Sequence, residues 1–315
     1  MSSAQNFCKL IQKLITITRC KADLAQTHLY NALDLAYNSY QSTDTIFDKV
    51  KRNEIAVPLL ILHGLLGSKS NFHTICKRYH GGSQPKRLVY AIDLRNHGDS
   101  PPSNHNTYED LMLDVLKFIR AMRLSKIHLL GHDIGGKIGM LISLKYPEII
   151  EKLILVDASP ISTSHNFQIY MEILQILNTI IFPANLSSEQ AKAHVINRLS
   201  RVVKNKGLMT VVLMNLTQIT DGSYTYRFNK RALLNHFQEL TSFPNVHNVQ
   251  YEGPVLFVGG GKSDYIQRSD YPKILQLFPK AELKYIEGAG HWVHAEKPNE
   301  FLKITMEFLN RTTAV

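Results

Sequence analysis

Cysteines are scarce in this chain, and long apolar runs are absent. The three cysteines, Cys8, Cys20 and Cys76, show no metal-ligand spacing and leave an odd count. We therefore expect a reducing compartment rather than a disulfide framework, and neither a metal nor a cofactor. No apolar run approaches the roughly 20 residues that a membrane-spanning helix needs, so any membrane contact is expected to be peripheral.

The chain also lacks a dense basic cluster with interleaved aromatic residues. Its 36 Lys and Arg against 26 Asp and Glu give a formal net charge of +10, but these residues are spread along the sequence. A scattered excess of this kind is typical of solvated surface. We expect no nucleic-acid partner.

Acidic residues are missing from the beginning of the sequence. No Asp or Glu precedes Asp23, whereas four basic residues do: Lys9, Lys13, Arg19 and Lys21. Apolar residues recur there at helical spacing with the lysines off that stripe, which is typical of an amphipathic transit peptide. The pattern predicts a transit peptide over residues 1–28 and a location in the mitochondrial matrix. A surface helix of a cytoplasmic protein is the alternative.

Strand and helix signals alternate through most of the 315 residues, which predicts a parallel sheet. The alternation breaks over residues 161–251, where the pattern is helical and rich in loops. We predict an α/β fold with a mostly parallel central sheet flanked by helices, formed by residues 29–160 and 252–315. Residues 161–251 are predicted to be a helical lid, inserted after a strand at 152–157.

A glycine-rich turn follows the apolar strand predicted at 126–132. Residues 131–136 read Gly-His-Asp-Ile-Gly-Gly, which fits the pattern of a nucleophile elbow. In such an elbow the nucleophile stands on a strained turn from strand to helix, and glycines flank it because side chains would collide there. Asp133 takes the nucleophile position. The backbone amides of Leu65 and Ile134 are the candidate donors of an oxyanion hole.

His291 is the candidate general base. It lies in the loop after the last predicted strand, directly after Gly288-Ala289-Gly290 and after the elbow in chain order, as the histidine of α/β-hydrolases does. Two acids compete to orient it. Asp157 ends the strand after the elbow helix, and Asp264 follows the strand after the lid.

Several segments of the sequence together resemble one family. Residues 63–68, 93–101, 156–160 and 288–298 are similar to those of the mitochondrial α/β-hydrolase domain-containing protein eleven family and its bacterial esterase relatives. The resemblance implies an α/β-hydrolase fold and ester hydrolysis, with links to diacylglycerol and to the 2-oxoglutarate dehydrogenase complex. By resemblance the orienting acid is Asp157. Asp133 departs from the family, which has serine there, and so does Asp264.

The aspartate changes which reaction the elbow favours. A carboxylate that attacks an ester would give an anhydride, so that step is uphill. A carboxylate that attacks a saturated carbon, opening an epoxide or displacing a halide, gives an ordinary ester that His291 can help water to hydrolyse. Epoxide opening also needs hydroxyl donors. Three lid tyrosines are candidates: Tyr170, Tyr224 and Tyr226.

Three functions therefore remain open. The first is a metal-free hydrolase of a small ester or an acylglycerol-type lipid. The family resemblance favours this function, and it extends over most of the sequence. The second is an epoxide hydrolase or dehalogenase that uses Asp133 as its nucleophile. The third is an impaired hydrolase homologue that binds a ligand or a partner, because loss of the serine nucleophile costs about 10⁶ in turnover.

Overall fold

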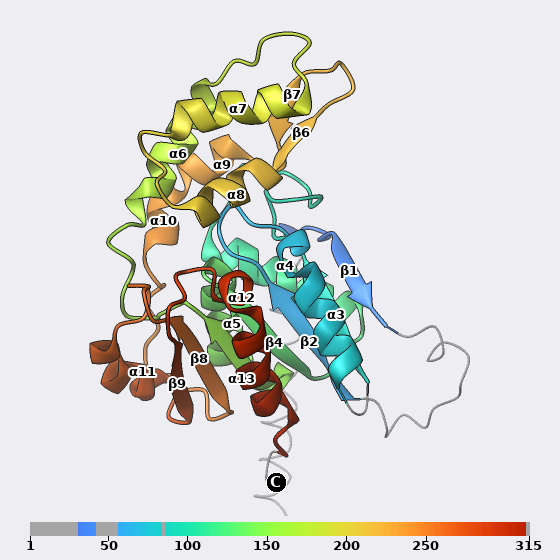
Figure 1. The fold of residues 1–315 in the computed structure, drawn as a ribbon. Coiled ribbons are helices and arrows are strands. Elements are labelled where there is room, and N and C mark those ends of the chain that lie inside the picture. Colours follow the sequence, from blue (N-terminus) through green and yellow to red (C-terminus); the bar gives the residue numbers. More distant parts are fainter. Residues whose placement is uncertain (1–30, 42–55, 84–85, 313–315) are drawn as a thin grey trace, which may run out of the picture.

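The computed structural model describes residues 31–41, 56–83 and 86–312 (Figure 1). The predicted transit peptide at residues 1–28 lies outside them. Seven strands of the described residues form one sheet, in the order β1-β3-β2-β4-β5-β8-β9. They are β1 (Tyr37–Tyr40), β2 (Ala56–Leu62), β3 (Arg87–Ile92), β4 (Ile127–His132), β5 (Ile150–Val156), β8 (Val255–Gly260) and β9 (Ala281–Ile286).

The sheet is mostly parallel, which confirms the predicted fold class. Only β1 runs antiparallel, against β3, and the five other pairings are parallel. A parallel strand is covered on both faces, so its apolar residues need not alternate with polar ones. β8 is an example, since all six of its residues are buried.

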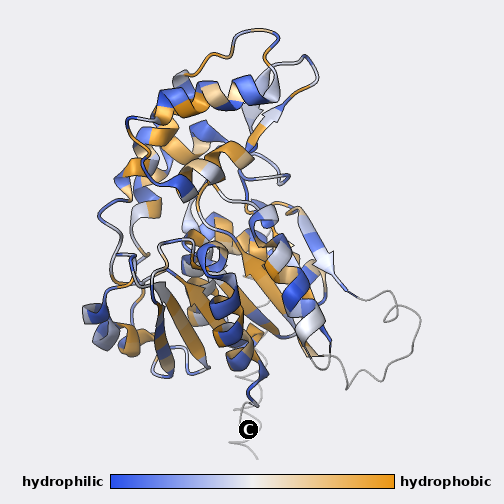
Figure 2. Ribbon diagram, viewed as in Figure 1, coloured by the Kyte–Doolittle hydropathy of each residue, from blue (hydrophilic) through white to orange (hydrophobic). Residues whose placement is uncertain are grey.

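Helices cover both faces of the sheet. On one face lie α3 (His73–Gly82), α12 (Val293–Glu296) and α13 (Pro298–Asn310), and on the other α4 (Tyr108–Ala121), α5 (Ile134–Lys145) and α11 (Tyr271–Leu277). Successive strand residues point to opposite faces, so Leu129 and Leu130 join different apolar clusters. Figure 2 shows the result: the strands are hydrophobic, and the helices carry hydrophilic residues.

The segment between β5 and β8 rises over one end of the sheet (Figure 1). It contains α6 (Gln168–Thr179), α7 (Ser188–Leu199), α8 (Lys206–Met214), the strand pair β6 (Leu216–Gln218) and β7 (Tyr224–Tyr226), α9 (Lys230–Asn235) and α10 (Phe237–Thr241). This is the part of the chain predicted to be the lid. Among the described residues, none of the helices is long and apolar enough to cross a membrane.

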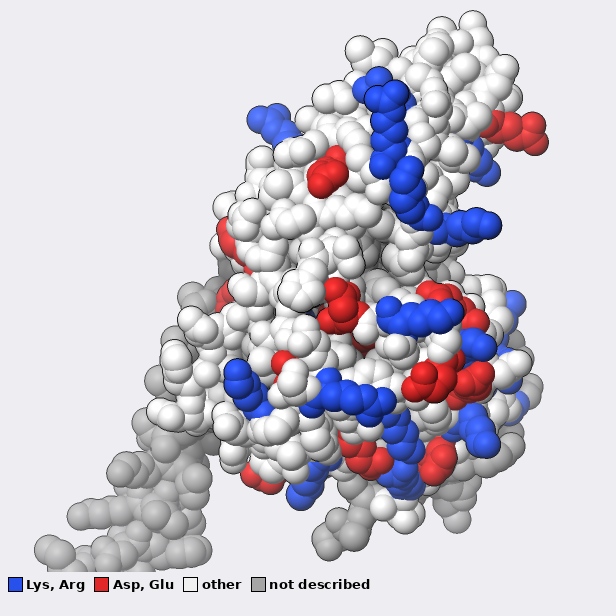
Figure 3. Space-filling view, turned by 60° about the vertical axis from the view of Figure 1, so that its left-hand side comes forward, with Lys and Arg blue, Asp and Glu red and all other residues white. Residues whose placement is uncertain are grey.

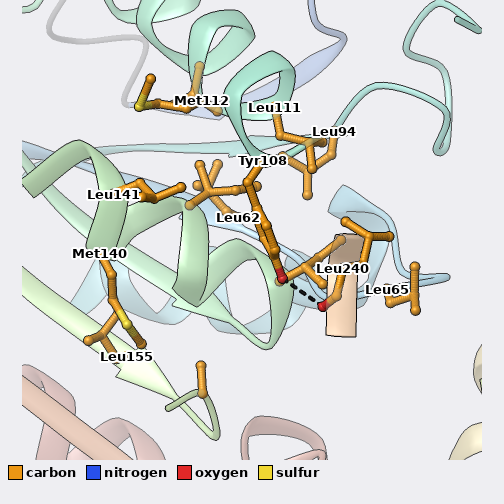
Figure 4. Close-up of a cluster of buried hydrophobic side chains, with 14 of the residues drawn as sticks. Leu62, Leu65, Leu94, Tyr108, Leu111, Met112, Met140, Leu141, Leu155 and Leu240 are labelled. Carbon is orange, nitrogen blue, oxygen red and sulfur yellow. Dashed lines mark hydrogen bonds between the residues drawn. The ribbon is translucent and has the colours of Figure 1, made fainter. Parts of the chain in front are cut away.

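Polar contacts fasten the lid to the loop after β3. The Asn229 backbone N–H donates to the carbonyl oxygen of Asn96 at 2.9 Å, and its side-chain amide donates to Asn96 Oδ1 at 3.1 Å. Farther along the interface, the Tyr108 hydroxyl of α4 donates to the Leu240 carbonyl oxygen at 3.1 Å. Figure 4 shows that bond within the apolar cluster around Leu62 and Leu65. The lid therefore packs directly on the elements that carry the site.

Candidate active site

Asp133 stands on the turn between β4 and α5. Its backbone has φ 51° and ψ −119°, a strained conformation for a residue other than glycine. Two glycines make the turn possible. A Cβ on Gly131 would lie 2.2 Å from the Gly135 carbonyl oxygen, and one on Gly135 would lie 2.6 Å from that of His63. The chain thus makes the sharp strand-to-helix turn that a nucleophile elbow requires.

The Asp133 carboxylate is directed at a predicted oxyanion-hole donor. The backbone N–H of Leu65 donates to Asp133 Oδ2 at 2.9 Å, and the Asp133 side chain is buried. The Ile134 amide, the other predicted donor, follows it at the start of α5. Within the described part of the chain, no hydrogen bond or ion pair joins Asp133 to His291. The carboxylate is therefore held by the backbone and not by the histidine.

His291 is oriented by Asp157. Its Nδ1 donates to Asp157 Oδ2 at 2.8 Å, and both residues are buried. Asp157 follows β5 and also accepts hydrogen bonds from the Gly260 amide, at 3.2 Å, and from the Ser263 hydroxyl. Three donors fix this carboxylate, which in turn fixes the imidazole with Nδ1 protonated. His291 Nε2 is then left as the basic nitrogen.

Asp264, the alternative acid, has a different set of partners. Its Oδ1 accepts from the Ser164 hydroxyl at 2.6 Å, and its Oδ2 accepts from the His165 backbone N–H at 3.1 Å. Both partners belong to the segment that leads into the lid. The structure therefore brings Asp157 to His291 and places Asp264 where it holds the beginning of the lid.

The charge state of His291 reflects several carboxylates. Burial lowers its pKa. The hydrogen bond to Asp157 and the negative charges of Asp157, Asp133 and Asp264 raise it, and the net pKa lies above the ordinary value.

The elbow also holds the loop of this histidine, because His132 Nε2 donates to the His291 carbonyl oxygen at 3.1 Å.

Tyr265 and Ser263 belong to the site, although no motif in the sequence pointed to them. The Tyr265 ring stacks on His291, with centroids 3.9 Å apart, and Tyr265 and Tyr170 both line the cavity there. Burial raises the pKa of both tyrosines, and so does the charge of Asp133. Two protonated phenols therefore lie at the cavity beside His291. The only available signal was their neighbour, because Ser263 and Tyr265 flank the candidate acid Asp264.

The structure does not bring the other two lid tyrosines to His291. Tyr224 donates to the Leu186 carbonyl oxygen at 3.3 Å, on the far part of the lid. Tyr226 stacks on Phe228, with centroids 5.4 Å apart. Of the three predicted lid tyrosines, Tyr170 alone lines the cavity at His291.

A buried lysine links the elbow helix to the lid. Lys137 lies one turn after Asp133 on α5, and its ammonium donates to the Thr241 carbonyl oxygen of α10 at 3.2 Å. Burial lowers its pKa to about 8, while the charge of Asp133 acts in the opposite direction. The position of the lid is thus tied to the helix that begins at the nucleophile position.

A cavity of about 560 Å³ opens between the lid and the core at His291. Its wall combines apolar and polar side chains, among them Tyr170, Val202, Lys204, Leu208, Tyr265 and Trp292. This volume is within the range of sites for small organic ligands. Among the described residues, no group of three or more His, Cys, Asp or Glu side chains is placed to hold a metal ion.

Comparison with known proteins places these features in a family. Residues 57–298 match the family profile described as alpha/beta hydrolase fold. The chain is 38% identical to the sn-1-specific diacylglycerol lipase ABHD11 of Danio rerio, over 81% of this chain and 78% of that protein. It is 36% identical to its counterpart from Mus musculus, over 80% of each chain. A solved marine microorganism esterase superposes with a TM-score of 0.76 at 31% identity, over 88% of this chain and 100% of that one.

Proposed function

Because the chain belongs to the α/β-hydrolase family and is a hydrolase, we propose that it acts on small carboxylic esters or acylglycerol-type lipids. The observation that carries the proposal is the bond of 2.8 Å between His291 Nδ1 and Asp157 Oδ2, at the wall of the cavity. It leaves Nε2 free to take a proton from water. The relatives named as diacylglycerol lipases support this substrate class.

On an ester, water is the nucleophile in this proposal. Water loses a proton to His291 Nε2 and bonds to the ester carbonyl carbon, and the alcohol leaves with the proton from His291 as the tetrahedral intermediate collapses. Asp133 does not form an acyl-enzyme, because its product would be an anhydride. The intermediate's oxyanion also competes with Asp133 for the Leu65 amide. We therefore expect slow ester turnover.

The bond from Leu65 to Asp133 favours a second candidate function, which is hydrolysis at a saturated carbon. One carboxylate oxygen is held by the amide and the other is available to attack. Attack on an epoxide carbon forms a C–O bond and breaks the ring C–O bond, and a tyrosine hydroxyl protonates the released alkoxide. Water activated by His291 then adds to the Asp133 ester. The resulting oxyanion lies on the Leu65 amide. The diol leaves with the proton from His291, and the proton left on the Asp133 carboxyl returns to the tyrosinate.

The test combines three substrates with three forms of the protein. A short-chain aryl ester, an aryl epoxide and a haloacid are each incubated with the natural chain, Asp133→Ser and Asp133→Ala. Ester turnover by the natural chain that survives Asp133→Ala supports the proposal, since water attacks without Asp133. Turnover of epoxide or haloacid that Asp133→Ala abolishes would replace it with the second candidate. If no form turns over any substrate, the chain is a binding protein instead.

Location and partner are separate proposals: the location comes from the residue pattern of 1–28, and the partner comes from the family resemblance. We propose import into the mitochondrial matrix through residues 1–28 and association there with the 2-oxoglutarate dehydrogenase complex. Incubation with isolated mitochondria checks the first, because import should shorten the chain at its N-terminus. Co-purification of the tagged chain with that complex checks the second. A full-length protein that stays outside the organelle would contradict the location.

A further inference from the structure

One stretch of the lid carries positive charge without any negative charge. Residues 190–220 contain five basic residues and no Asp or Glu. All five are exposed and none forms an ion pair within the described part of the chain: Lys192, Arg198, Arg201, Lys204 and Lys206. Figure 3 shows Lys and Arg side chains in a column down the lid, whereas the core below mixes both signs. We call residues 190–220 the basic lid stretch.

Exposed apolar side chains gather on the same part of the molecule. Six large hydrophobic residues of the described chain are notably exposed, and five of them lie between residues 161 and 251. These are Ile161 (38%), Ile181 (86%), Ile196 (42%), Met214 (51%) and Ile219 (45%), and the sixth is Tyr37 on β1 (41%). Three of the five belong to the basic lid stretch. Solvent contact of this kind costs free energy that burial against another apolar phase would recover.

The end of the lid presents its most exposed isoleucine rigidly. The Phe182 ring packs against those of His194 on α7 and Tyr224 on β7, with centroids 5.8 and 5.7 Å away. The Tyr224 hydroxyl holds the same loop through the Leu186 carbonyl oxygen. Ile181 precedes this anchor and is directed outward. Figure 1 places the loop, α7 and the β6–β7 pair together at the end of the lid farthest from the sheet.

We infer that the basic lid stretch and the loop at Ile181 dock on the surface of an anionic lipid bilayer. Unpaired Lys and Arg are attracted by acidic headgroups, and aliphatic side chains insert at the boundary of the acyl chains. A nucleic acid would use the cations but has no place for exposed isoleucines. An anionic bilayer matches both features.

Docking in this orientation would also bring a bilayer to the cavity. Val202, Lys204 and Leu208 lie in the basic lid stretch and line the cavity at His291. An acylglycerol could then pass from the bilayer to the site without crossing water. This consequence rests on the proposed function, whereas the docking itself needs no catalytic step.

Sedimentation with vesicles tests the docking. The full chain is mixed with phosphatidylcholine vesicles with and without phosphatidylserine, and bound protein is measured at low and high salt. We expect binding that requires phosphatidylserine and weakens with salt. Arg198→Ser and Arg201→Ser should each weaken it about fivefold, which corresponds to about 1 kcal/mol per cation. Ile181→Asp should weaken it about tenfold, as expected for loss of one inserted side chain.

Matched controls come from the core. Tyr37→Asp changes an exposed apolar residue outside the lid, and Lys303→Ser removes an exposed cation of α13. Both should bind as the natural chain does. Residues 1–28 are present in every variant, so a difference between lid and core variants does not come from them. Turnover of a soluble ester, measured in parallel, reports on the proposed function independently of vesicle binding.

Three results would overturn the inference. One is absence of binding to vesicles that contain phosphatidylserine, and another is equal binding by lid and core variants. The third is binding that the arginine substitutions weaken but Ile181→Asp leaves unchanged. That result would indicate a surface for a soluble polyanion such as a nucleic acid.

Discussion

The backbone N–H of Leu65 donates a hydrogen bond of 2.9 Å to the carboxylate of Asp133. A donor predicted to stabilise a substrate oxyanion therefore already holds the residue at the nucleophile position. In an ester hydrolase this contact obstructs the reaction. In a hydrolase that attacks saturated carbon it prepares the reaction, because the bound oxygen becomes the carbonyl oxygen of the enzyme ester. The predictions below separate these two roles.

Asp133→Ser should raise ester turnover. Serine supplies a hydroxyl nucleophile whose acyl product is an ordinary ester, and it removes the negative charge from the Leu65 amide. Since a serine nucleophile is worth about 10⁶ and one oxyanion donor about 10²–10³, we expect kcat to increase by at least about 100-fold. Hydrolysis of an aryl ester, followed spectrophotometrically, measures the change.

Asp133→Ala is the control for that experiment. It vacates the oxyanion hole but provides no nucleophile, so any increase in ester turnover that it shares with Asp133→Ser comes from the vacated hole alone. The expectation for the serine variant fails if its turnover does not exceed that of the alanine variant.

Asp157→Asn and Asp264→Asn should have unequal effects. The first removes the acceptor that keeps His291 Nδ1 protonated, and loss of that acceptor in a comparable triad lowers kcat by about 10⁴. The second alters the hydrogen bonds to Ser164 and His165 and removes the smallest of the charges that raise the His291 pKa, so kcat should change far less than with Asp157→Asn. Equal losses would show that Asp264 shares the orienting role.

Folding stability should fall steeply in mild acid. Burial lowers the pKa of His97, His128 and His294 to about 3 each, and lowers that of His63 and His132 as well. Between these pKa values and the ordinary histidine pKa, the unfolded chain binds protons that the folded chain does not. Stability is therefore lost as pH falls through that window, by about 2 kcal/mol between pH 7 and pH 5 for each of His97, His128 and His294. Urea unfolding at the two pH values measures it.

His128→Leu provides the matched control for the acid effect. This side chain lies on β4, its Nδ1 has no hydrogen-bond partner among the described atoms, and it lies outside the cavity at His291. The substitution removes one of the groups that titrate on unfolding. The difference in unfolding free energy between pH 7 and pH 5 should therefore shrink by the contribution of one histidine. His291 acts in the opposite direction, because its pKa is raised and its contribution is lost as pH rises. Equal unfolding free energies at pH 7 and pH 5 would contradict the prediction.

The sheet and the elbow could be predicted because their signals are local. Buried parallel strands read as apolar runs, and the predicted strand at 126–132 corresponds to β4 at Ile127–His132. The elbow was likewise predictable, since Gly131 and Gly135 occupy positions where a Cβ would collide with backbone. Such constraints act within a few residues, so the sequence displays them directly.

The partners within the site could not be predicted in the same way. Asp157 and Asp264 both follow strands whose ends meet at one edge, and only the packed structure separates their roles. The stacking of Tyr265 on His291 joins residues from different loops. The contact from Leu65 to Asp133 was also unexpected, because sequence reasoning treated the oxyanion hole as vacant.

Tyr170→Phe should distinguish the two candidate reactions. Tyr170 and Tyr265 line the cavity at His291, and burial raises the pKa of both, so their hydroxyls stay protonated. Epoxide opening creates an alkoxide that needs a proton from such a donor, and general acid catalysis contributes about 10²–10⁴. Ester hydrolysis by water receives its proton back from His291 instead. If the natural chain opens epoxides, Tyr170→Phe should lower that kcat about 100-fold and leave ester turnover nearly unchanged.

Tyr224→Phe is the matched control. This residue lies on the far part of the lid, so the substitution should affect neither reaction. Equal losses in both reactions would mean that Tyr170 acts by shaping the cavity, since a proton donor specific to epoxide opening cannot slow ester hydrolysis.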